Sequence, residues 1–217
     1  MTLPPDPTQA PGVSTGAILA PTAQAAWRSP RAWLILVVVA FLGLVSDLAT
    51  KYAAFMNIAP VPVALRRADV MAVRSPSMLI PPHEPVVVVP RVLNFTLVAN
   101  PGAVFGIGAG KRLVFVGFTF VAIALGLALF GLWTHRGDWL SHAGVGLLIA
   151  GGVGNLYDRV VYACVRDFIH PLPGVELPFG WEYPWGGREV WPYVSNVADL
   201  WLIVAILVLL YRSWRPK

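Results

Sequence analysis

The stretch 196-NVADLWLIVAILVLLY-211 combines an apolar run long enough for a membrane-spanning helix with a carboxylate near its start. A helix needs about 20 mostly apolar residues to cross the roughly 30 Å of hydrocarbon in a bilayer. Asp199 lies one helical turn after Asn196, at the mouth of this run. Taken alone, Asn196 fits an N-cap and Asp199 fits a first-turn acid that interacts favourably with the helix dipole. Because an ionisable side chain beside lipid is costly, however, a function is the default expectation.

The composition of the 217-residue chain is that of a membrane protein. Hydrophobic residues make up 57% of it and charged residues only 12%, about half the share of charged residues found in soluble domains. The single cysteine, Cys164, excludes an internal disulfide. The net charge of +5 is attributed to Lys and Arg beside the membrane. No nucleic-acid partner is expected, because no compact basic patch is interleaved with aromatic residues.

Four apolar segments predict an α-helical membrane protein with four transmembrane helices. The third segment is the least apolar, because glycine and polar residues fill its second half. Its small residues predict that neighbouring helices approach it closely. The segments are residues 32–50, 113–133, 139–162 and 197–213, and the small residues are Gly144, Gly146, Gly151, Gly152 and Gly154.

Outside these segments, the chain has an N-terminal stretch and two long connections. Residues 1–27 are rich in Pro, Ala, Thr and Gln and predict a disordered tail before a single membrane domain at 28–217. The connection 58–111 carries β-branched runs at 61–75 and 86–100, which predict a small β-sheet at the membrane surface between the first two helices.

The connection 169–195 is rich in Pro, Trp and Tyr, so it is expected to lie along the lipid headgroups.

The polar residues of the spans collect at one side of the membrane. Because successive spans alternate in direction, the end of the first, the end of the third and the start of the fourth all face the same way. Asp47 and Lys51, spaced i,i+4, suit an ion pair on one helix face, and Arg166 is a candidate partner of Asp167. The polar set is Asp47, Lys51, Asn100, Asn155, Asp158, Arg159, Asp167, Asn196 and Asp199.

Two acids that meet at this face offer an acid–base pair. Two carboxylates in one site ionise at different pH, so together they can activate water for peptide hydrolysis without a metal or a cofactor. The helix dipole favours Asp199 as the base, although the proton belongs to the pair. No HExxH, GxSxG or phosphate-loop motif is present. The alternative is an ion-coupled transporter, whose acids would be expected near the midplane of the membrane.

Five segments resemble the motifs of lipoprotein signal peptidase, also called signal peptidase II, a family of bacterial membrane aspartyl peptidases. With the four apolar spans, they cover the chain from about residue 32 to 213. In order, the segments are 47-DLATK-51, 100-NPGAVFG-106, 151-GGVGNLYDR-159, 165-VRDF-168 and 196-NVAD-199.

The resemblance implies that Asp167 and Asp199 are the catalytic dyad and that no metal or cofactor takes part. It also implies roles for the other motif residues. Asn155, Arg159 and Asn196 would position the substrate and the dyad, and Asp158 would be a structural acid beside Arg159. The remaining positions, which would line the site or its periplasmic cradle, are Asp47, Lys51, Asn100 and Gly102.

The implied substrate is a prolipoprotein whose cysteine already carries diacylglycerol, cleaved just before that cysteine. The implied protein is a multi-pass monomer of the bacterial inner membrane, in contact with membrane lipid, with its site near the periplasmic face. A count of Lys and Arg between the spans favours the opposite orientation, so the orientation rests on the resemblance.

The chain departs from the family pattern in a few places. The family usually has Gly where Ala163 stands, an apolar residue where Arg166 stands, Ala where Val104 stands and Phe where Ser195 stands. The stretch between the two acids is also longer than is usual. These departures concern loop conformation and substrate access rather than the reaction.

Overall fold

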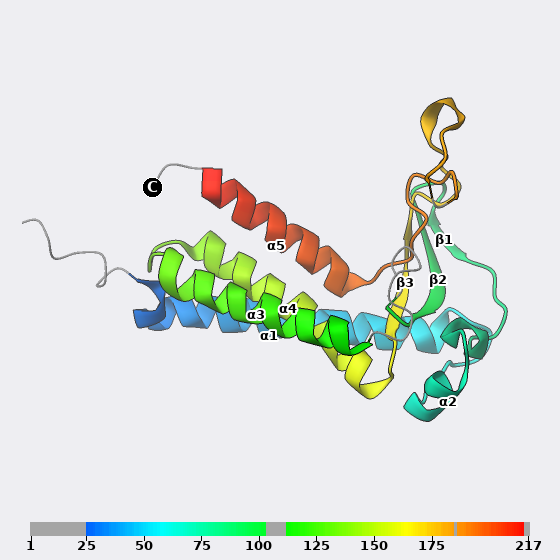
Figure 1. The fold of residues 1–217 in the computed structure, drawn as a ribbon, viewed down its shortest axis with the longest axis horizontal. Coiled ribbons are helices and arrows are strands. Elements are labelled where there is room, and N and C mark those ends of the chain that lie inside the picture. Colours follow the sequence, from blue (N-terminus) through cyan, green and yellow to red (C-terminus); the bar gives the residue numbers. More distant parts are fainter. Residues whose placement is uncertain (1–24, 103–111, 185, 215–217) are drawn as a thin grey trace, which may run out of the picture.

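Four long helices run along one another and carry a small β-sheet at one end (Figure 1). The computed structural model describes residues 25–102, 112–184 and 186–214, and expectations for other positions, such as Val104 and residues 1–24, lie outside the described residues. The long helices are α1 (Pro30–Asn57), α3 (Arg112–Trp133), α4 (Trp139–Val161) and α5 (Val197–Trp214). The short helical segments are η2 (Ala26–Arg28), α2 (Arg67–Ala72), η3 (Pro76–Leu79) and η4 (Pro178–Gly180).

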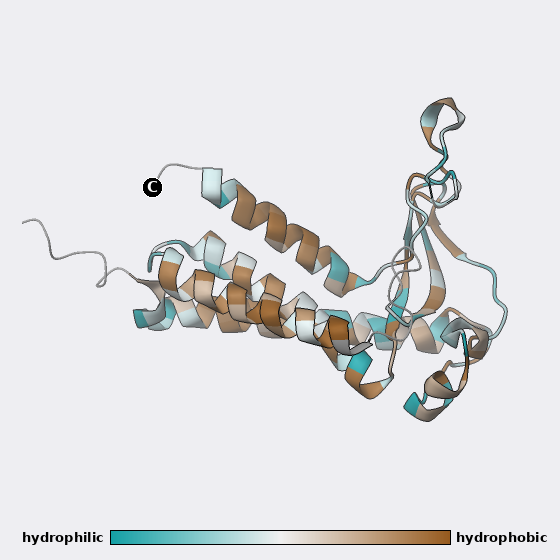
Figure 2. Ribbon diagram, viewed as in Figure 1, coloured by the Kyte–Doolittle hydropathy of each residue, from teal (hydrophilic) through white to brown (hydrophobic). Residues whose placement is uncertain are grey.

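Three of the long helices meet a bilayer's requirements by length and hydropathy. They are Pro30–Asn57, Val114–Trp133 and Val197–Trp214, and Figure 2 shows the long helices as predominantly hydrophobic. They expose large apolar side chains such as Phe118 (72%) and Leu132 (80%). Such a surface needs lipid as its solvent, so the chain is a membrane protein. The remaining predicted span, the third segment in the sequence, is α4, which packs against α1, α3 and α5. Its surroundings are largely protein, which explains its lower hydropathy, and its passage through the membrane stays a prediction.

Glycines allow this close packing around α4. A Cβ atom on Gly151 would lie 2.5 Å from the carbonyl oxygen of Ala198 in α5, and one on Gly146 would lie 2.8 Å from that of Leu36 in α1. Both separations are too short for real atoms, so only glycine fits. Gly152 differs, because the nearest atom to its Cβ would be an ordinary 3.5 Å away. The expected close approach is therefore confirmed for part of the glycine set.

The short helical turn η2 begins within the predicted tail and leads into α1. Ala26 is fully buried, and its backbone N–H donates to the carbonyl of Thr134 at 3.0 Å. Ser29 then caps α1 by accepting a 3.3 Å hydrogen bond from the backbone N–H of Ala32. The prediction of disorder through residue 27 is thus wrong for residues 25–27, because this turn packs against the end of α3.

The sheet has the strand order β1-β2-β3 and is antiparallel throughout. Its strands are β1 (Val86–Val89), β2 (Leu93–Asn100) and β3 (Val165–Pro171). The expected strand within 86–100 is confirmed as two strands. The expectation that the sheet lies wholly between the first two spans is wrong, because β3 follows α4 and pairs with β2.

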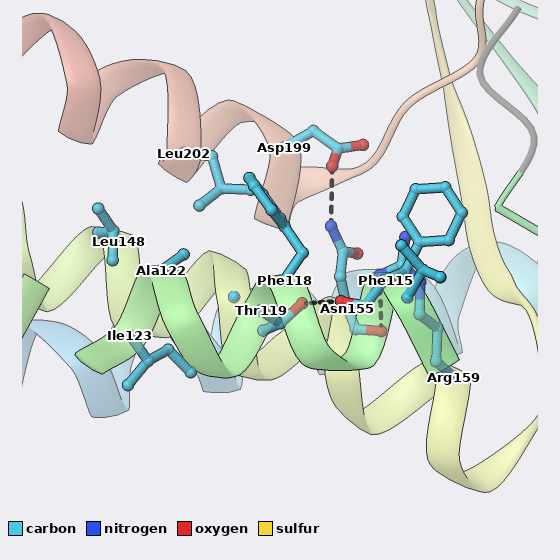
Figure 3. Close-up of a pocket in the computed structure, with 12 residues that line it drawn as sticks. Phe115, Phe118, Thr119, Ala122, Ile123, Leu148, Asn155, Arg159, Asp199 and Leu202 are labelled. Carbon is cyan, nitrogen blue, oxygen red and sulfur yellow. Dashed lines mark hydrogen bonds between the residues drawn. The ribbon is translucent and has the colours of Figure 1, made fainter. Parts of the chain in front are cut away.

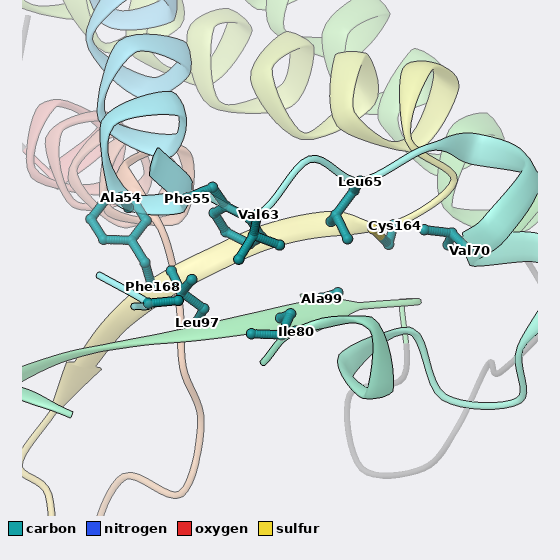
Figure 4. Packing of buried hydrophobic residues seen from close by; sticks show 11 residues of the cluster. Ala54, Phe55, Val63, Leu65, Val70, Ile80, Leu97, Ala99, Cys164 and Phe168 are labelled. Carbon is teal, nitrogen blue, oxygen red and sulfur yellow. The ribbon is translucent and has the colours of Figure 1, made fainter. Parts of the chain in front are cut away.

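The strand predicted at 61–75 is also wrong. This segment forms an irregular stretch and then α2. Both edges of β2 are already occupied by β1 and β3, so a further strand has no partner on β2. Val63 and Leu65 instead pack with Phe168 and Leu97 in a buried cluster beneath the sheet (Figure 4). The apolar residues of this segment therefore pack against one face of the sheet as part of the hydrophobic core.

The long connection between β3 and α5 projects beyond the sheet (Figure 1). At its base, Ile169 and Ser195 exchange two backbone hydrogen bonds, each 2.8 Å long. Farther out, the backbone N–H of Val190 donates to the carbonyl of Val175 at 2.7 Å. Residues 172–194 thus form a hairpin-like excursion whose two ends are held together, and its location at the headgroups stays a prediction.

Ala163 occupies a backbone conformation that favours glycine. It directly follows the last residues of α4 and has a φ of 63°, which costs a non-glycine residue roughly 1–2 kcal/mol. We expect Ala163→Gly to stabilise the protein by about 1 kcal/mol and to raise Tm by about 2–4 °C. Thermal unfolding in detergent measures this change. Ala53→Gly, at an exposed position inside α1, should have the opposite effect, and a lower Tm for Ala163→Gly would contradict the prediction.

Two neighbouring glycines of α4 test the packing argument. A methyl group on Gly154 would overlap with the carboxylate of Asp47, whereas one on Gly152 would meet only ordinary contacts. We expect Gly154→Ala to lower the free energy of unfolding by about 1–3 kcal/mol and Gly152→Ala to leave it nearly unchanged. Thermal or denaturant unfolding of both variants provides the comparison, and equal effects would refute the assignment.

Candidate active site

Asp167 and Asp199 meet where β3 and the first turn of α5 come together. Asn196 contacts both acids: its side-chain Nδ2 donates to Oδ1 of Asp167 at 2.6 Å, and its backbone N–H donates to Oδ2 of Asp199 at 3.2 Å. In return, Oδ1 of Asn196 accepts from the backbone N–H of Asp199 at 3.1 Å. This reciprocal pair is a capping box. The cap expected at Asn196 is therefore also the bridge between the two acids.

Two further side-chain amides donate hydrogen bonds to the carboxylate oxygens that Asn196 does not contact. Asn100, at the end of β2, donates to Oδ2 of Asp167 at 2.9 Å, and Asn155, on α4, donates to Oδ1 of Asp199 at 2.8 Å. Oδ1 of Asn100 in turn accepts from the backbone N–H of Gly102 at 2.9 Å. Gly102 has a φ of 97°, and a side chain there would crowd the ring of Phe115. The expected glycine and amides thus lie together at the site.

Lys51 lies at the centre of a buried polar network behind the dyad. Its ammonium group donates to Oδ2 of Asp47 at 2.8 Å and to Oδ1 of Asn155 at 3.0 Å, and it lies 3.4 Å from Oδ2 of Asp158. The i,i+4 pair predicted for Asp47 and Lys51 is therefore confirmed. Oδ1 of Asp47 also accepts from the backbone N–H of Ala198 at 2.8 Å, which ties α1 to the first turn of α5.

The predicted partner of Arg166 is wrong. Arg166 pairs with Asp158 rather than with Asp167, because successive side chains of a strand point to opposite faces. Its Nη2 lies 2.8 Å and its Nε 3.2 Å from Oδ1 of Asp158, and its backbone N–H donates to Oδ2 at 3.0 Å. Nη1 of Arg159 donates to the carbonyl of Asn155 at 3.1 Å, and the charge of Asp158 acts on Arg159 without a direct hydrogen bond among the described contacts.

The two acids have different environments. Asp167 is only 2% exposed, and burial followed by the nearby charge of Asp199 raises its pKa from 3.8 to about 7. Hydrogen bonds from Asn100 and Asn196 oppose this rise but do not cancel it. Asp199 is more accessible and reaches a cavity. The arrangement favours a protonated Asp167 near neutral pH, and the assignment of Asp199 as the base stays a prediction.

The cavity has a volume of about 430 Å³ and lies between α3, α4 and α5 (Figure 3). Asn155, Arg159 and Asp199 line its polar end. Side chains of α3, including Phe115, Phe118 and Thr119, form one wall, and sequence analysis missed this wall. Thr119 was the only polar signal in that part of the helix. Among the described residues, no group of three or more His, Cys, Asp or Glu side chains is arranged to hold a metal ion.

Comparison with known proteins places this site in a family. The family model described as Signal peptidase (SPase) II matches residues 39–215. The chain belongs to the signal peptidase II family. The match contains all the motif residues named above.

Individual relatives agree with this assignment. The chain is 36% identical over 131 residues to a lipoprotein signal peptidase of Bifidobacterium longum (strain DJO10A), which covers 59% of this chain and 63% of that protein. It is 32% identical over 127 residues to a lipoprotein signal peptidase of Desulfitobacterium hafniense (strain DSM 10664 / DCB-2), covering 58% and 72%. The chain thus spans less than two thirds of the length of the Bifidobacterium protein.

A solved structure shares the fold. A bacterial membrane enzyme determined by the in meso method at 1.9 Å resolution superposes with a TM-score of 0.55 at 24% identity, covering 86% of this chain and 94% of that one. At this identity the likeness concerns the fold. The overall fold of this signal peptidase II family member is therefore one that it shares with a known bacterial membrane enzyme.

The raised pKa of Asp167 predicts a pH-dependent stability. Because the folded protein binds this proton more tightly than the unfolded chain, the contribution is fully present below about pH 4 and is lost as the pH rises through about 7. Each pKa unit corresponds to about 1.4 kcal/mol, so the change is on the order of 4 kcal/mol. Thermal unfolding between about pH 4 and 8 should show a decline for the wild type that Asp167→Asn lacks. Parallel curves for the two proteins would contradict the prediction.

Proposed function

We propose that the chain is an aspartyl endopeptidase that removes the signal peptide from diacylglyceryl-modified prolipoproteins, cutting just before the lipidated cysteine. Family membership and the names of the relatives support this function. The observation that carries it is the joint contact of Asn196 with Asp167 and Asp199, because it holds two carboxyl groups from different elements in one acid–base site.

The proposed reaction assigns a separate role to each acid. Asp199, which reaches the cavity, takes a proton from water as the water oxygen attacks the scissile carbonyl carbon. Asp167, whose pKa of about 7 lets it hold a proton near neutral pH, gives that proton to the carbonyl oxygen. When the peptide bond breaks, the proton on Asp199 passes to the leaving nitrogen, and a hydroxyl group of the tetrahedral intermediate returns a proton to Asp167 as the carbonyl re-forms. Both acids are then in their starting state. The amides of Asn100 and Asn155 keep both carboxyl groups in position during these steps.

The cavity supports a lipidated substrate. Its walls from α3 and α5 are mainly apolar and include Phe118, Ile123 and Leu202, and its polar end contains Asp199. An acyl chain in this space would place the cysteine to which it is attached near the dyad. In this proposal α4 also spans the inner membrane, the sheet and the 169–195 connection lie on the periplasmic side, and the protein acts as a monomer.

Variants of the two acids test the proposal. We expect Asp167→Asn and Asp199→Asn each to lower cleavage of a synthetic diacylglyceryl-modified prolipoprotein peptide by at least about a hundredfold, because each loses its acid–base function. Asp69→Asn, which changes an exposed acid on α2, is the matched control and should retain activity. All variants should still insert into membranes.

Full cleavage by either dyad variant would overturn the assignment of the acids. The ion-coupled transporter is distinguished in the same preparation by reconstituting the protein into liposomes with a proton gradient. Proton-coupled solute uptake without any peptide cleavage by the wild type would replace the proposed function with transport.

A further inference from the structure

Four charged side chains form a buried cluster directly behind the dyad. Asp47, Lys51 and Asp158 are fully buried and Arg166 nearly so. Two of them are negative and two positive, so the cluster is balanced. Such a balance matters, because removing one member of a buried ion network leaves an uncompensated charge in a medium of low polarity. We call this set, Asp47, Lys51, Asp158 and Arg166, the charge cluster.

We propose that Arg166 is a positioning residue for the dyad, because by occupying Asp158 it leaves Lys51 to hold Asp47 and Asn155. This inference rests on the proposed function and adds to it a residue that does not contact the substrate.

The distances show that Arg166 and Lys51 bind different partners. Arg166 engages both oxygens of Asp158, with its guanidinium on Oδ1 and its backbone N–H on Oδ2. Lys51 lies 3.4 Å from Asp158 but makes shorter hydrogen bonds to Asp47 and Asn155. Without the guanidinium, Lys51 would be the remaining cation in contact with Asp158 among the described residues. The ammonium group would then be drawn toward Asp158 and away from Asn155.

The contact between Lys51 and Asn155 decides how the amide of Asn155 is oriented. An ammonium group can only donate hydrogen bonds, so Asn155 must present Oδ1 to Lys51 and Nδ2 to Asp199. Oδ1 of Asn155 also accepts from Asn196 at 3.2 Å, which reinforces the same orientation. Loss of Arg166 would therefore weaken the hydrogen bond from Asn155 to Asp199 without removing either catalytic acid.

Arg166 lies on the opposite face of β3 from Asp167. Its guanidinium stacks 4.3 Å from the ring centre of Tyr162, and it does not line the cavity described above. Substitution of Arg166 should therefore change kcat and leave KM nearly unchanged. This expectation separates a positioning residue from one that binds the substrate.

Arg166 also influences the protonation of the dyad through its charge. The charged groups that face Asp167 are Asp199 from α5, Lys51 from α1 and Arg159 from α4, and β2 contributes the neutral amide of Asn100. Removing Arg166 adds one uncompensated negative charge, Asp158, behind this group. A further negative charge favours the protonated form of Asp167, so the pH dependence of the dyad should move upward.

Three variants test the proposal: Arg166→Met, Arg166→Lys and the double variant Asp158→Asn/Arg166→Met. We expect Arg166→Met to lower kcat about tenfold, the size of losing one charge-assisted hydrogen bond, with KM unchanged. Its pH–rate profile should shift upward by about 1 pH unit. Arg166→Lys keeps the charge but loses the contact of two guanidinium nitrogens with Asp158. Its kcat should therefore be intermediate, and its pH profile should match that of the wild type. The double variant restores the charge balance and should recover most of the kcat and the original pH profile.

The control is Arg188→Met, which removes an exposed arginine paired with Glu182 on the hairpin-like excursion, and it should match the wild type. If Arg166 is merely structural, Arg166→Met lowers Tm, its pH profile does not move, and the double variant gives no recovery; this result overturns the proposal. If Arg166→Met does not fold, Arg166→Lys decides, because a shifted pH profile in a variant that keeps the charge contradicts the argument.

A readout without substrate separates this inference from the proposed function. The difference in Tm between each protein and its Asp167→Asn counterpart, followed against pH, reports the titration of Asp167 alone. Arg166→Met should move this inflection upward by about 1 pH unit. An unmoved inflection would overturn the role of Arg166 even in an active enzyme. A shifted inflection in a protein whose wild type fails to cleave any lipidated peptide would overturn only the proposed function.

Discussion

Lys51 is fully buried, and its ammonium group must find hydrogen-bond acceptors within the protein because water does not reach it. Those acceptors come from its own helix, through Asp47, and from α4, through Asn155 and Asp158. Asp47 then reaches the backbone at the start of α5. The need to satisfy one cation therefore fixes how three long helices meet at the end of the bundle that carries the sheet. The glycines of α4 are a consequence, since Gly154 leaves the space that Asp47 occupies.

The dyad derives its asymmetry from the two kinds of backbone that carry it. Asp167 lies in a strand between α4 and β2 and is buried on all sides, so its charged form is disfavoured. Asp199 lies in the first turn of a helix, where its carboxyl group accepts a hydrogen bond from the backbone N–H of Asn196 and reaches the cavity. Two identical side chains thus have different surroundings because of their location. At the boundary between the sheet and the helices, the buried strand position of Asp167 and the helix start of Asp199 are close enough for Asn196 to contact both acids.

Much of this arrangement follows from local sequence patterns, and the remainder depends on contacts between distant segments. Apolar length predicted the long helices, i,i+4 spacing predicted the Asp47–Lys51 pair, and the alternation of spans placed the acids at one end. β3 was missed because 165-VRDFIHP-171 carries three charged or titratable side chains and both of its faces are covered. The strand expected at 61–75 has suitable residues, but its apolar side chains pack beneath the sheet instead of pairing at an edge. The partner of Arg166 was misassigned for a related reason, since the strand conformation that separates it from Asp167 was itself not predicted.

The backbone exchange between Ile169 and Ser195 closes the 172–194 excursion at its base, immediately before the chain returns to Asn196 and Asp199. The positions of Asp167 and Asp199 are consequently independent of how many residues lie beyond the Ile169–Ser195 hydrogen bonds. Because the entropy of closing a loop rises only slowly with its length, extra chain can be accommodated there at small cost. The outer part of the excursion therefore tolerates genetic fusion. A reporter domain or an affinity epitope inserted there lies away from the helix bundle and leaves Asp167 and Asp199 in place.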